Sequence, residues 1–297
     1  MRPLRYLLVS GPAALMVGTL TLTASSTANV AAPARTGNPA YSARFITAAR
    51  AALAHYLRRN HPQLMLAGHA HAGPNGTTGL RSFNWSGYAD GANTTSAGTF
   101  THVGGSWTAP SVACGAEDQL TVEWVGFDGL FSGSVEQVGT IGWCYKGSPI
   151  YFTWWQMFPT GNVLTEVGST LQPGDKITAS VTRSGTSYTL KLKDATRPAN
   201  SFKTIQTCPA TTCLDTSAEW ISERPAFAQV GFAPQAHYNA FKITNGSQTA
   251  NGTAGTIASF STVNAITMVD ATNAYSLNTV SSLSGGNSFS TAWQNSW

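Results

Sequence analysis

Charged side chains are scarce in this sequence: Asp, Glu, Lys and Arg together make up 10% of its 297 residues, and hydrophobic residues make up 42%. Lysine and glutamate are especially rare, whereas glycine, serine and threonine are abundant. Because long surface helices usually carry many charged residues, this composition predicts an all-β protein. The length allows one sizeable hydrophobic core, with a segment left over at the N-terminus.

Acidic residues are absent from the first 80 positions, which nevertheless hold seven arginines. The other ten basic residues and all thirteen acids lie in residues 81–297, which gives that part a formal charge of −3. The net charge of +4 therefore belongs to the N-terminal segment. A nucleic-acid partner, which a positive net charge suggests, is not expected.

Several catalytic signatures are also missing. The sequence has no HExxH motif of zinc peptidases, no GxSxG elbow and no glycine-rich phosphate loop after a strand. His102 and His237 are the only histidines after residue 80, so a Ser-His-Asp triad has few candidate bases. Leu214-Asp215-Thr216-Ser217 resembles one Asp-Thr/Ser-Gly loop of the pepsin type, but it lacks the glycine and has no second copy.

The N-terminus has the pattern of a secretory signal peptide. Arg2 and Arg5 precede an apolar run from Leu7 to about Leu22, and small residues follow, with possible cleavage after Ala28 or Ala32. The run is short and interrupted by Ser, Gly and Pro, whereas a membrane-spanning helix needs about 20 apolar residues. We therefore expect residues 1–32 to be removed and the protein to be secreted to the extracellular space, with no membrane attachment afterwards.

Residues 33–80 differ in composition from the rest and are predicted to be a propeptide, although a plain N-terminal extension fits the same pattern. Residues 44–57 have the spacing of a short amphipathic helix. A Gly- and His-rich linker follows, with an HxH pair at His69 and His71. Because no carboxylate lies nearby, a metal site is not expected there, and protonation of these histidines in acid could instead loosen the linker.

Four cysteines remain, and an even number in an exported protein favours two disulfides. Cys114–Cys144 and Cys208–Cys213 are the favoured pairs, and the spacing leaves other pairings open. Zinc binding is not expected because neither pair has CxxC spacing.

From Phe83 onward the hydrophobic pattern has a period of two, with turn signals such as Asn245-Gly246 between the segments. Many short, evenly spaced strands predict one β-sandwich domain over residues 81–297. The predicted strands are 99–108, 120–128, 134–143, 150–158, 176–182, 187–192, 218–223, 240–243 and 258–268.

Aromatic and polar residues share faces of these strands. Alternation places Trp124 with Asp128, and Trp154 with Gln156. Because unpaired polar groups are costly in a dry core, such a face suits a wet groove that binds an extended polymer. A core of aromatic residues with polar groups at its edge remains the alternative.

Glu219 lies on a predicted strand with Glu223 on the same face. A glycosidase needs two carboxylates flanking the scissile bond, and these two are separated by roughly 13 Å of strand, which is too far for either glycosidase geometry. By its spacing alone, a glutamate of this kind is most often a solvated strand residue.

An ordered set of motifs spans nearly all of residues 83–297: NWSGY at 84–88, GSWTAP at 105–110, WVGFDG at 124–129, EQVGT at 136–140, YFTWWQMFP at 151–159, PGD at 173–175 and AEWI at 218–221. Through these motifs, taken in order, the chain resembles the glutamic peptidases (eqolisins).

The resemblance implies a sandwich of two antiparallel sheets with the substrate cleft on a concave face. It implies that Glu219 and Gln137 are the catalytic pair and that Trp124 and Asp128 line the cleft near them. Gln156 and Trp154, which share a strand face, are the other expected substrate-binding residues. At Gln156 the family often has glutamate, so one possible negative neighbour of Glu219 is missing here.

These observations predict a secreted acid endopeptidase that acts on proteins or peptides by activating water, with no covalent intermediate. No metal or cofactor is expected, and we expect a monomer. The alternative is a carbohydrate-binding sandwich without catalysis, which would use its exposed tryptophans as stacking platforms: Trp85, Trp107, Trp124, Trp154 and Trp155.

Overall fold

The computed structural model describes residues 41–57, 62–68, 70–72, 78–91, 99–115, 118–168, 170–227 and 231–296. The predicted signal peptide, residues 1–32, lies outside these ranges, as does His69. All of the described residues belong to one compact unit, residues 34–297. Within them, no helix is both long and apolar enough to cross a membrane.

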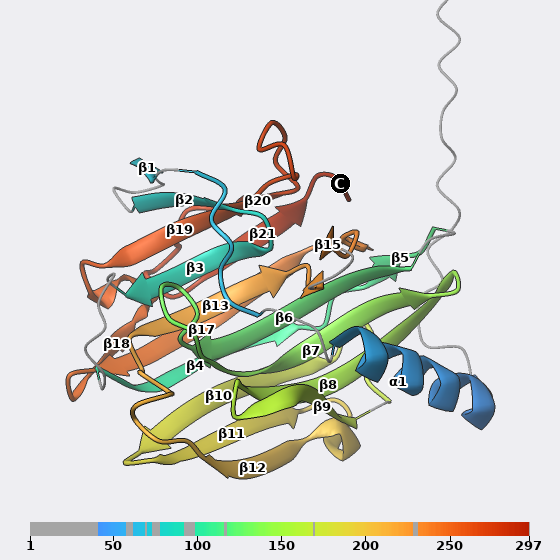
Figure 1. Cartoon of the computed structure of the whole chain (residues 1–297), viewed down its shortest axis with the longest axis horizontal. Coiled ribbons are helices and arrows are strands. Elements are labelled where there is room, and N and C mark those ends of the chain that lie inside the picture. The colour runs from blue at the N-terminus through green and yellow to red at the C-terminus, as the bar shows by residue number, and fades with distance from the viewer. Residues whose placement is uncertain are drawn as a thin grey trace, which may run out of the picture. The chain divides into compact units, whose positions relative to one another are not determined.

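Two large sheets form the fold (Figure 1). The first has nine strands, in the spatial order β1 (His71–Ala72), β2 (Thr78–Ser82), β19 (Val263–Met268), β3 (Trp85–Gly91), β13 (Ser217–Glu223), β6 (Gln119–Phe127), β7 (Val135–Tyr145), β8 (Ser148–Phe158) and β9 (Gly161–Gly168). All neighbours in it are antiparallel except β2 and β19.

The second sheet has eight strands. In spatial order they are β12 (Phe202–Thr207), β11 (Ser187–Asp194), β10 (Lys176–Ser184), β4 (Phe100–Thr108), β17 (Phe241–Ala250), β21 (Phe289–Trp293) and β20 (Asn278–Val280), with β18 (Thr253–Thr256) paired to β17. Two short pairs complete the strands: β5 (Val112–Ala113) with β16 (His237–Tyr238), and β14 (Ala226–Phe227) with β15 (Gly231–Phe232). Two 3-10 turns, η2 and η3, cover Pro198–Asn200 and Ile257–Ser259.

Alternation along the strands divides the apolar residues into two cores. In β6, Val125 and Phe127 join the core between the two sheets, together with Val103 of β4. Val122 and Trp124 point to the opposite face of the nine-stranded sheet and join a second core there. The predicted all-β sandwich is therefore confirmed, and it carries an additional apolar layer on one outer face.

Helix α1 (Ala43–Leu57) supplies the cover of that second core. Ala49 and Leu53 are buried in it, and Phe45 is partly buried, at the spacing that puts all three on one helix face. The Ser42 hydroxyl accepts a hydrogen bond from the Phe45 amide (3.3 Å) and so caps the first turn. The helix predicted over 44–57 thus forms, and it lies against the β7, β8 and β9 side of the sheet (Figure 1).

Most predicted strands are confirmed with closely matching ends, and both favoured disulfides, Cys114–Cys144 and Cys208–Cys213, are present. The strand predicted over 258–268 begins only at Val263. The residues before it form η3, because the Thr256 and Ser259 side chains and backbones bond to each other in a capping box. The predicted boundary between propeptide and catalytic domain, at residues 80 and 81, falls inside β2.

Candidate active site

Four neighbouring strands in the middle of the nine-stranded sheet bring the predicted catalytic residues to one level. The register pairs Glu219 of β13 with Gly126 of β6, Gly126 with Gln137 of β7, and Gln137 with Gln156 of β8. Residues that are paired in this way point to the same side of the sheet. Glu219, Gln137 and Gln156 therefore lie in one row, on the face that also carries Trp124; we call it the covered face.

Gly126 separates the carboxylate from the amide. A Cβ atom added to Gly126 would lie 2.7 Å from the Glu136 carbonyl oxygen and 3.0 Å from the Gln137 Cβ. Any larger residue would therefore displace Gln137 or its backbone. With glycine at the central position, Glu219 and Gln137 face each other from strands that are roughly 10 Å apart.

The polar atoms of this row are buried and only partly paired. Glu219 is 0% exposed and Gln137 is 1% exposed. The Gln137 Nε2 group donates to Gln156 Oε1 (2.9 Å), which holds the amide from the side away from Glu219. Among the described residues, neither Glu219 oxygen nor Gln137 Oε1 has a hydrogen-bond partner. Three oxygens that can accept protons or hydrogen bonds are thus left unpaired on the two residues that flank Gly126.

Burial raises the pKa of Glu219 well above its ordinary value. The Ser217 hydroxyl on the same strand lowers this pKa, although it makes no regular hydrogen bond, and the charges of Asp128 and Asp90 raise it. Of these effects burial is the largest, so in the covered state Glu219 is protonated in acid.

Trp124 and Trp154 lie beside the polar row. The register pairs both with Gly139 of β7, so they flank this glycine in the way that Glu219 and Gln137 flank Gly126. The Trp124 indole nitrogen donates to Glu223 Oε2 (2.8 Å), and the ring makes an edge contact with Trp85, with ring centres 5.0 Å apart. Burial raises the pKa of Glu223 to about 8 while the Trp124 bond lowers it, so below neutral pH Glu223 is a neutral acceptor that orients the indole.

Asp128, which was expected to line the cleft, instead has its carboxylate occupied by hydrogen bonds from neighbouring segments. It follows β6 with φ of 66°, a left-handed conformation that Asp tolerates better than most residues. Its carboxylate accepts hydrogen bonds from the segment that leads into β13 and from the β6–β7 loop: the donors are the amides of Leu214, Asp215 and Thr216 and the hydroxyls of Thr216 and Ser134. In this structure Asp128 therefore anchors the start of the strand that carries Glu219.

A buried acidic cluster lies on the opposite side of the same strands, and the sequence patterns did not reveal it. One carboxylate oxygen each of Asp128, Glu136 and Asp215 lie within 4.8 Å of one another. Asp215 is paired with the Arg183 guanidinium (2.8 Å) and accepts from the Tyr188 hydroxyl. Because donors already occupy Asp128 and Asp215, the cluster suits a shared proton better than a metal ion.

Glu136 is the residue that would carry this proton. Neither of its oxygens has a hydrogen-bond partner among the described residues. Burial raises its pKa well above the ordinary value, and the charges of Asp128, Asp215 and Glu219 raise it further. Its place next to Gln137 in the chain was the only sequence signal, and alternation turns it to the other side of the sheet.

The segment before β1 closes over the covered face. The Leu64 amide donates to the Gly129 carbonyl (2.9 Å), and the Gln63 side chain donates to the Gly133 carbonyl (3.0 Å). The Met65 amide donates to the Asn84 side chain (2.9 Å). Residues 62–67 thus bridge the β6–β7 loop and the start of β3, and helix α1 packs on the tryptophans beside them. The wet groove expected from the sequence is therefore buried by the protein's own N-terminal segment.

Comparisons with known proteins agree with this geometry. The sequence matches the Peptidase A4 family over residues 83–293. No curated protein matches the chain. Among solved structures, scytalido-glutamic peptidase bound to a transition state analog inhibitor is 23% identical, with a TM-score of 0.58 over 71% of this chain and 98% of its own.

Two further structures have the same fold. SCP-B, a peptidase of the Eqolisin family in complex with the tripeptide Ala-Ile-His, is 21% identical, with a TM-score of 0.55 over 71% of this chain and 98% of its own. Aspergilloglutamic peptidase from Aspergillus niger is 21% identical, with a TM-score of 0.50 over 59% of this chain and 99% of its own. Since the family match covers most of the sequence, this protein belongs to the Peptidase A4 family of glutamic peptidases, the eqolisins.

Proposed function

We propose that this peptidase is a secreted acid endopeptidase in which Glu219 and Gln137 act together on a water molecule. The observation that carries the proposal is the row Glu219–Gly126–Gln137, in which a carboxylate and an amide face each other across a glycine. Their oxygens are the unpaired acceptors of that row. Such a pair can bind one water and one peptide carbonyl between its members.

The residue types supply each group that peptide hydrolysis needs. Ionised Glu219 takes a proton from water while the water oxygen bonds to the peptide carbon, and the carbonyl oxygen becomes an oxyanion. Gln137 Nε2, which has a second hydrogen beside the one given to Gln156, donates to that oxyanion. The carbon–nitrogen bond then breaks, and Glu219 returns its proton to the leaving amine.

The covering segment makes the chain a zymogen in this proposal. Under the cover Glu219 is protonated in acid and is therefore not a base. Removal of residues 41–67 would return water to the carboxylate and bring its pKa back toward about 4.3, the ordinary value of glutamate. The mature enzyme would then ionise Glu219 in mild acid and be active there.

The test is acid incubation of the purified precursor, followed by N-terminal sequencing and a casein assay with pepstatin present. We expect cleavage between α1 and β3, and activity that appears only with cleavage and resists pepstatin. A Glu219→Gln precursor should remain both uncleaved and inactive. Full activity of the intact precursor would disprove the zymogen, and an active Glu219→Gln enzyme would disprove the catalytic pair.

The alternative of a carbohydrate-binding module has no support from the position of the tryptophans. Trp85, Trp107, Trp124 and Trp154 are all buried, and Trp155 packs partly against the core between the sheets. In the covered precursor none of these five offers an open ring face for stacking on a sugar.

A further inference from the structure

Most acidic side chains of this protein are buried, so its formal charge does not describe its surface. Ten of the thirteen acids are buried: Asp90, Glu123, Asp128, Glu136, Asp175, Asp194, Asp215, Glu219, Glu223 and Asp270. The value of −3 for residues 81–297 therefore overstates the negative charge that a partner meets. In acid, where the remaining carboxylates become neutral, the surface charge is set by lysine and arginine.

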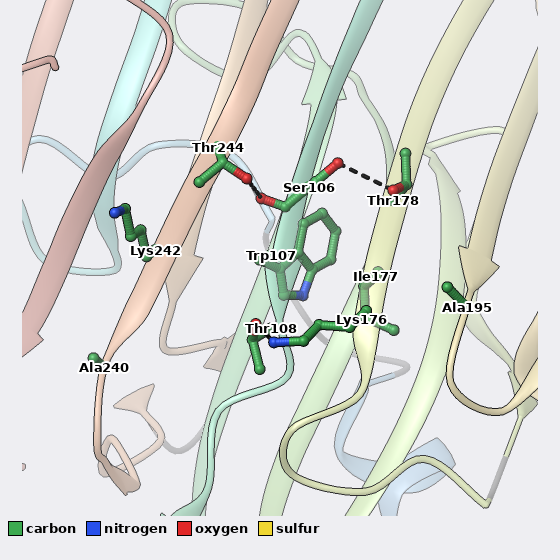
Figure 2. Close-up of a pocket in the computed structure, with 10 residues that line it drawn as sticks. All are labelled: Ser106, Trp107, Thr108, Lys176, Ile177, Thr178, Ala195, Ala240, Lys242 and Thr244. Atoms are coloured by element: carbon green, nitrogen blue, oxygen red, sulfur yellow. Dashed lines mark hydrogen bonds between the residues drawn. The ribbon is translucent and has the colours of Figure 1, made fainter. Parts of the chain in front are cut away.

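Five of the six lysines lie on one surface, the outer face of the eight-stranded sheet, which we call the lysine face. All five are exposed. Lys191 of β11 is directly opposite Lys203 of β12, and Lys193 follows two residues later on the same face. Lys176 of β10 and Lys242 of β17 lie at the sides of a groove across β4 (Figure 2).

The groove between these last two lysines has a volume of about 500 Å³. Its walls carry hydroxyl groups that already bond to one another: Ser106 contacts Thr178 (3.0 Å), and the Lys176 ammonium donates to Thr108 (2.8 Å) (Figure 2). Trp107 and Ile177 are buried beneath them. A ligand on this face would meet ammonium groups and rows of hydroxyls.

Fold stability does not account for this arrangement. Like charges directly opposite each other on neighbouring strands destabilise a sheet, as Lys191 and Lys203 do here. Lysines on an edge strand can prevent sheet-to-sheet aggregation, but that reason covers only Lys203, since β10 and β11 are interior strands. In the described part of this sheet the one acid, Asp194, is buried, so no exposed carboxylate balances the lysines.

We propose that the lysine face binds an acidic polysaccharide. Charge complementarity requires a polyanion, and the rows of serine and threonine hydroxyls match a partner rich in hydroxyls. Single-stranded nucleic acid binds through aromatic stacking, and the tryptophan of this groove is buried beneath it. A bilayer surface requires apolar side chains that insert, and Ile205 is the one large apolar side chain exposed on the described strands of this sheet. If the polysaccharide binds the lysine face of the eight-stranded sheet, the covered face of the nine-stranded sheet, which carries Glu219, is not blocked by it.

The experiment uses the full-length precursor at about pH 6, titrated with dextran sulfate and with polygalacturonate, and with uncharged dextran as the comparison. We expect saturable binding to the two acidic glycans that weakens as salt rises. The triple variant Lys191→Gln, Lys193→Gln and Lys203→Gln should raise Kd about tenfold, because each exposed ion pair contributes modestly. The double variant Lys176→Gln and Lys242→Gln tests the groove separately.

Lys146→Gln is the matched control, since this sixth lysine is also exposed but lies in the turn between β7 and β8 of the other sheet. It should leave Kd unchanged within about twofold, because exposed charges of that kind contribute little. Equal weakening by Lys146→Gln and by the triple variant, or equal binding of uncharged dextran, would overturn the proposal. Tighter binding to a single-stranded oligonucleotide or to phosphatidylglycerol vesicles than to the two acidic glycans would also overturn it. Because the experiment measures binding and not hydrolysis, its outcome does not depend on the proposed catalytic mechanism.

Discussion

The covered face of the nine-stranded sheet and the lysine face of the eight-stranded sheet follow the same alternating pattern but have opposite chemistry. On the first, Glu219, Gln137 and Trp124 are buried under a segment of the same chain. On the second, lysines and hydroxyls are exposed, and Lys191 and Lys203 face each other without a counter-charge. The comparison teaches that burial of the carboxylates, more than their number, determines where this protein has charge.

The largest expected effect comes from removing the carboxylate of the covered face. In the mature enzyme, Glu219→Gln should abolish casein hydrolysis almost completely, because the base is lost while shape is kept. Gln137→Ala should lower kcat by roughly 10²–10³, the usual effect of losing an oxyanion donor. Glu223→Gln is the matched control on the same strand: it can still accept from Trp124 and should keep most of the activity. Near-normal turnover by Glu219→Gln would show that Glu219 is not the catalytic base.

The next effect concerns the glycine between the pair. Gly126→Ala should lower kcat by up to about 100-fold, because its Cβ would displace Gln137 by a fraction of an ångström to an ångström. KM for a short peptide should change less than kcat. Gly133→Ala, in the β6–β7 loop where an added Cβ meets no atom within 4 Å, is the control. An active Gly126→Ala enzyme would mean that the spacing across the row is not critical.

Buried carboxylates should also make the protein less stable as pH rises. Their pKa values are raised in the folded state, to about 7 for Asp215 and about 8 for Glu123, so their stabilising effect is complete below about pH 4 and is lost as pH rises through 7 to 8. Glu136→Gln removes one such group. It should measurably reduce the loss of unfolding free energy between pH 4 and pH 8, because the raised pKa of Glu136 contributes to that loss.

Thermal unfolding at pH 4, 6 and 8 measures this effect. Asp118→Asn changes a partly exposed acid and should leave the difference between the three values unchanged. If Glu136→Gln has the same pH dependence as the parent protein, the shared proton of the acidic cluster does not control stability.

A smaller effect is expected at Gln156. Gln156→Glu keeps the acceptor for Gln137 but adds a negative charge about 10 Å or more from Glu219, which should raise the pKa of Glu219 in the mature enzyme by roughly 0.3–1 unit. Because ionised Glu219 is the base, the acidic limb of the kcat/KM profile should move to higher pH by that amount. An unmoved acidic limb would show that position 156 acts on Gln137 alone.

The smallest effect tests the lysine face. Lys203→Gln removes one member of the opposed pair and should increase the unfolding free energy by about 0.2–1 kcal/mol at low salt. The gain should shrink as salt is added, because these charges are exposed to solvent. A loss of stability would indicate that an unseen counter-charge already balances this face.

Alternation and turn signals were sufficient to predict most of the central strands of both sheets, including those that carry Glu219, Gln137, Trp124 and Gln156. Among the strands that they missed is β3, whose segment WSGYADG has no alternation of apolar and polar residues. Its Asp90 is accommodated by bonds from Gln248 and Thr262, which are distant in sequence.

By itself, the sequence determined the sandwich and the identity of the row residues, because these depend on period, spacing and family motifs, and it favoured the two disulfide pairs that form. Only the tertiary structure decided the state of the site. Strand register places Glu219 and Gln137 on either side of Gly126 although they are far apart in the chain, and burial in the folded protein raises the pKa of Glu219. Tertiary folding likewise buried ten acids and left the lysines outside, a division that no count of charges along the chain contains.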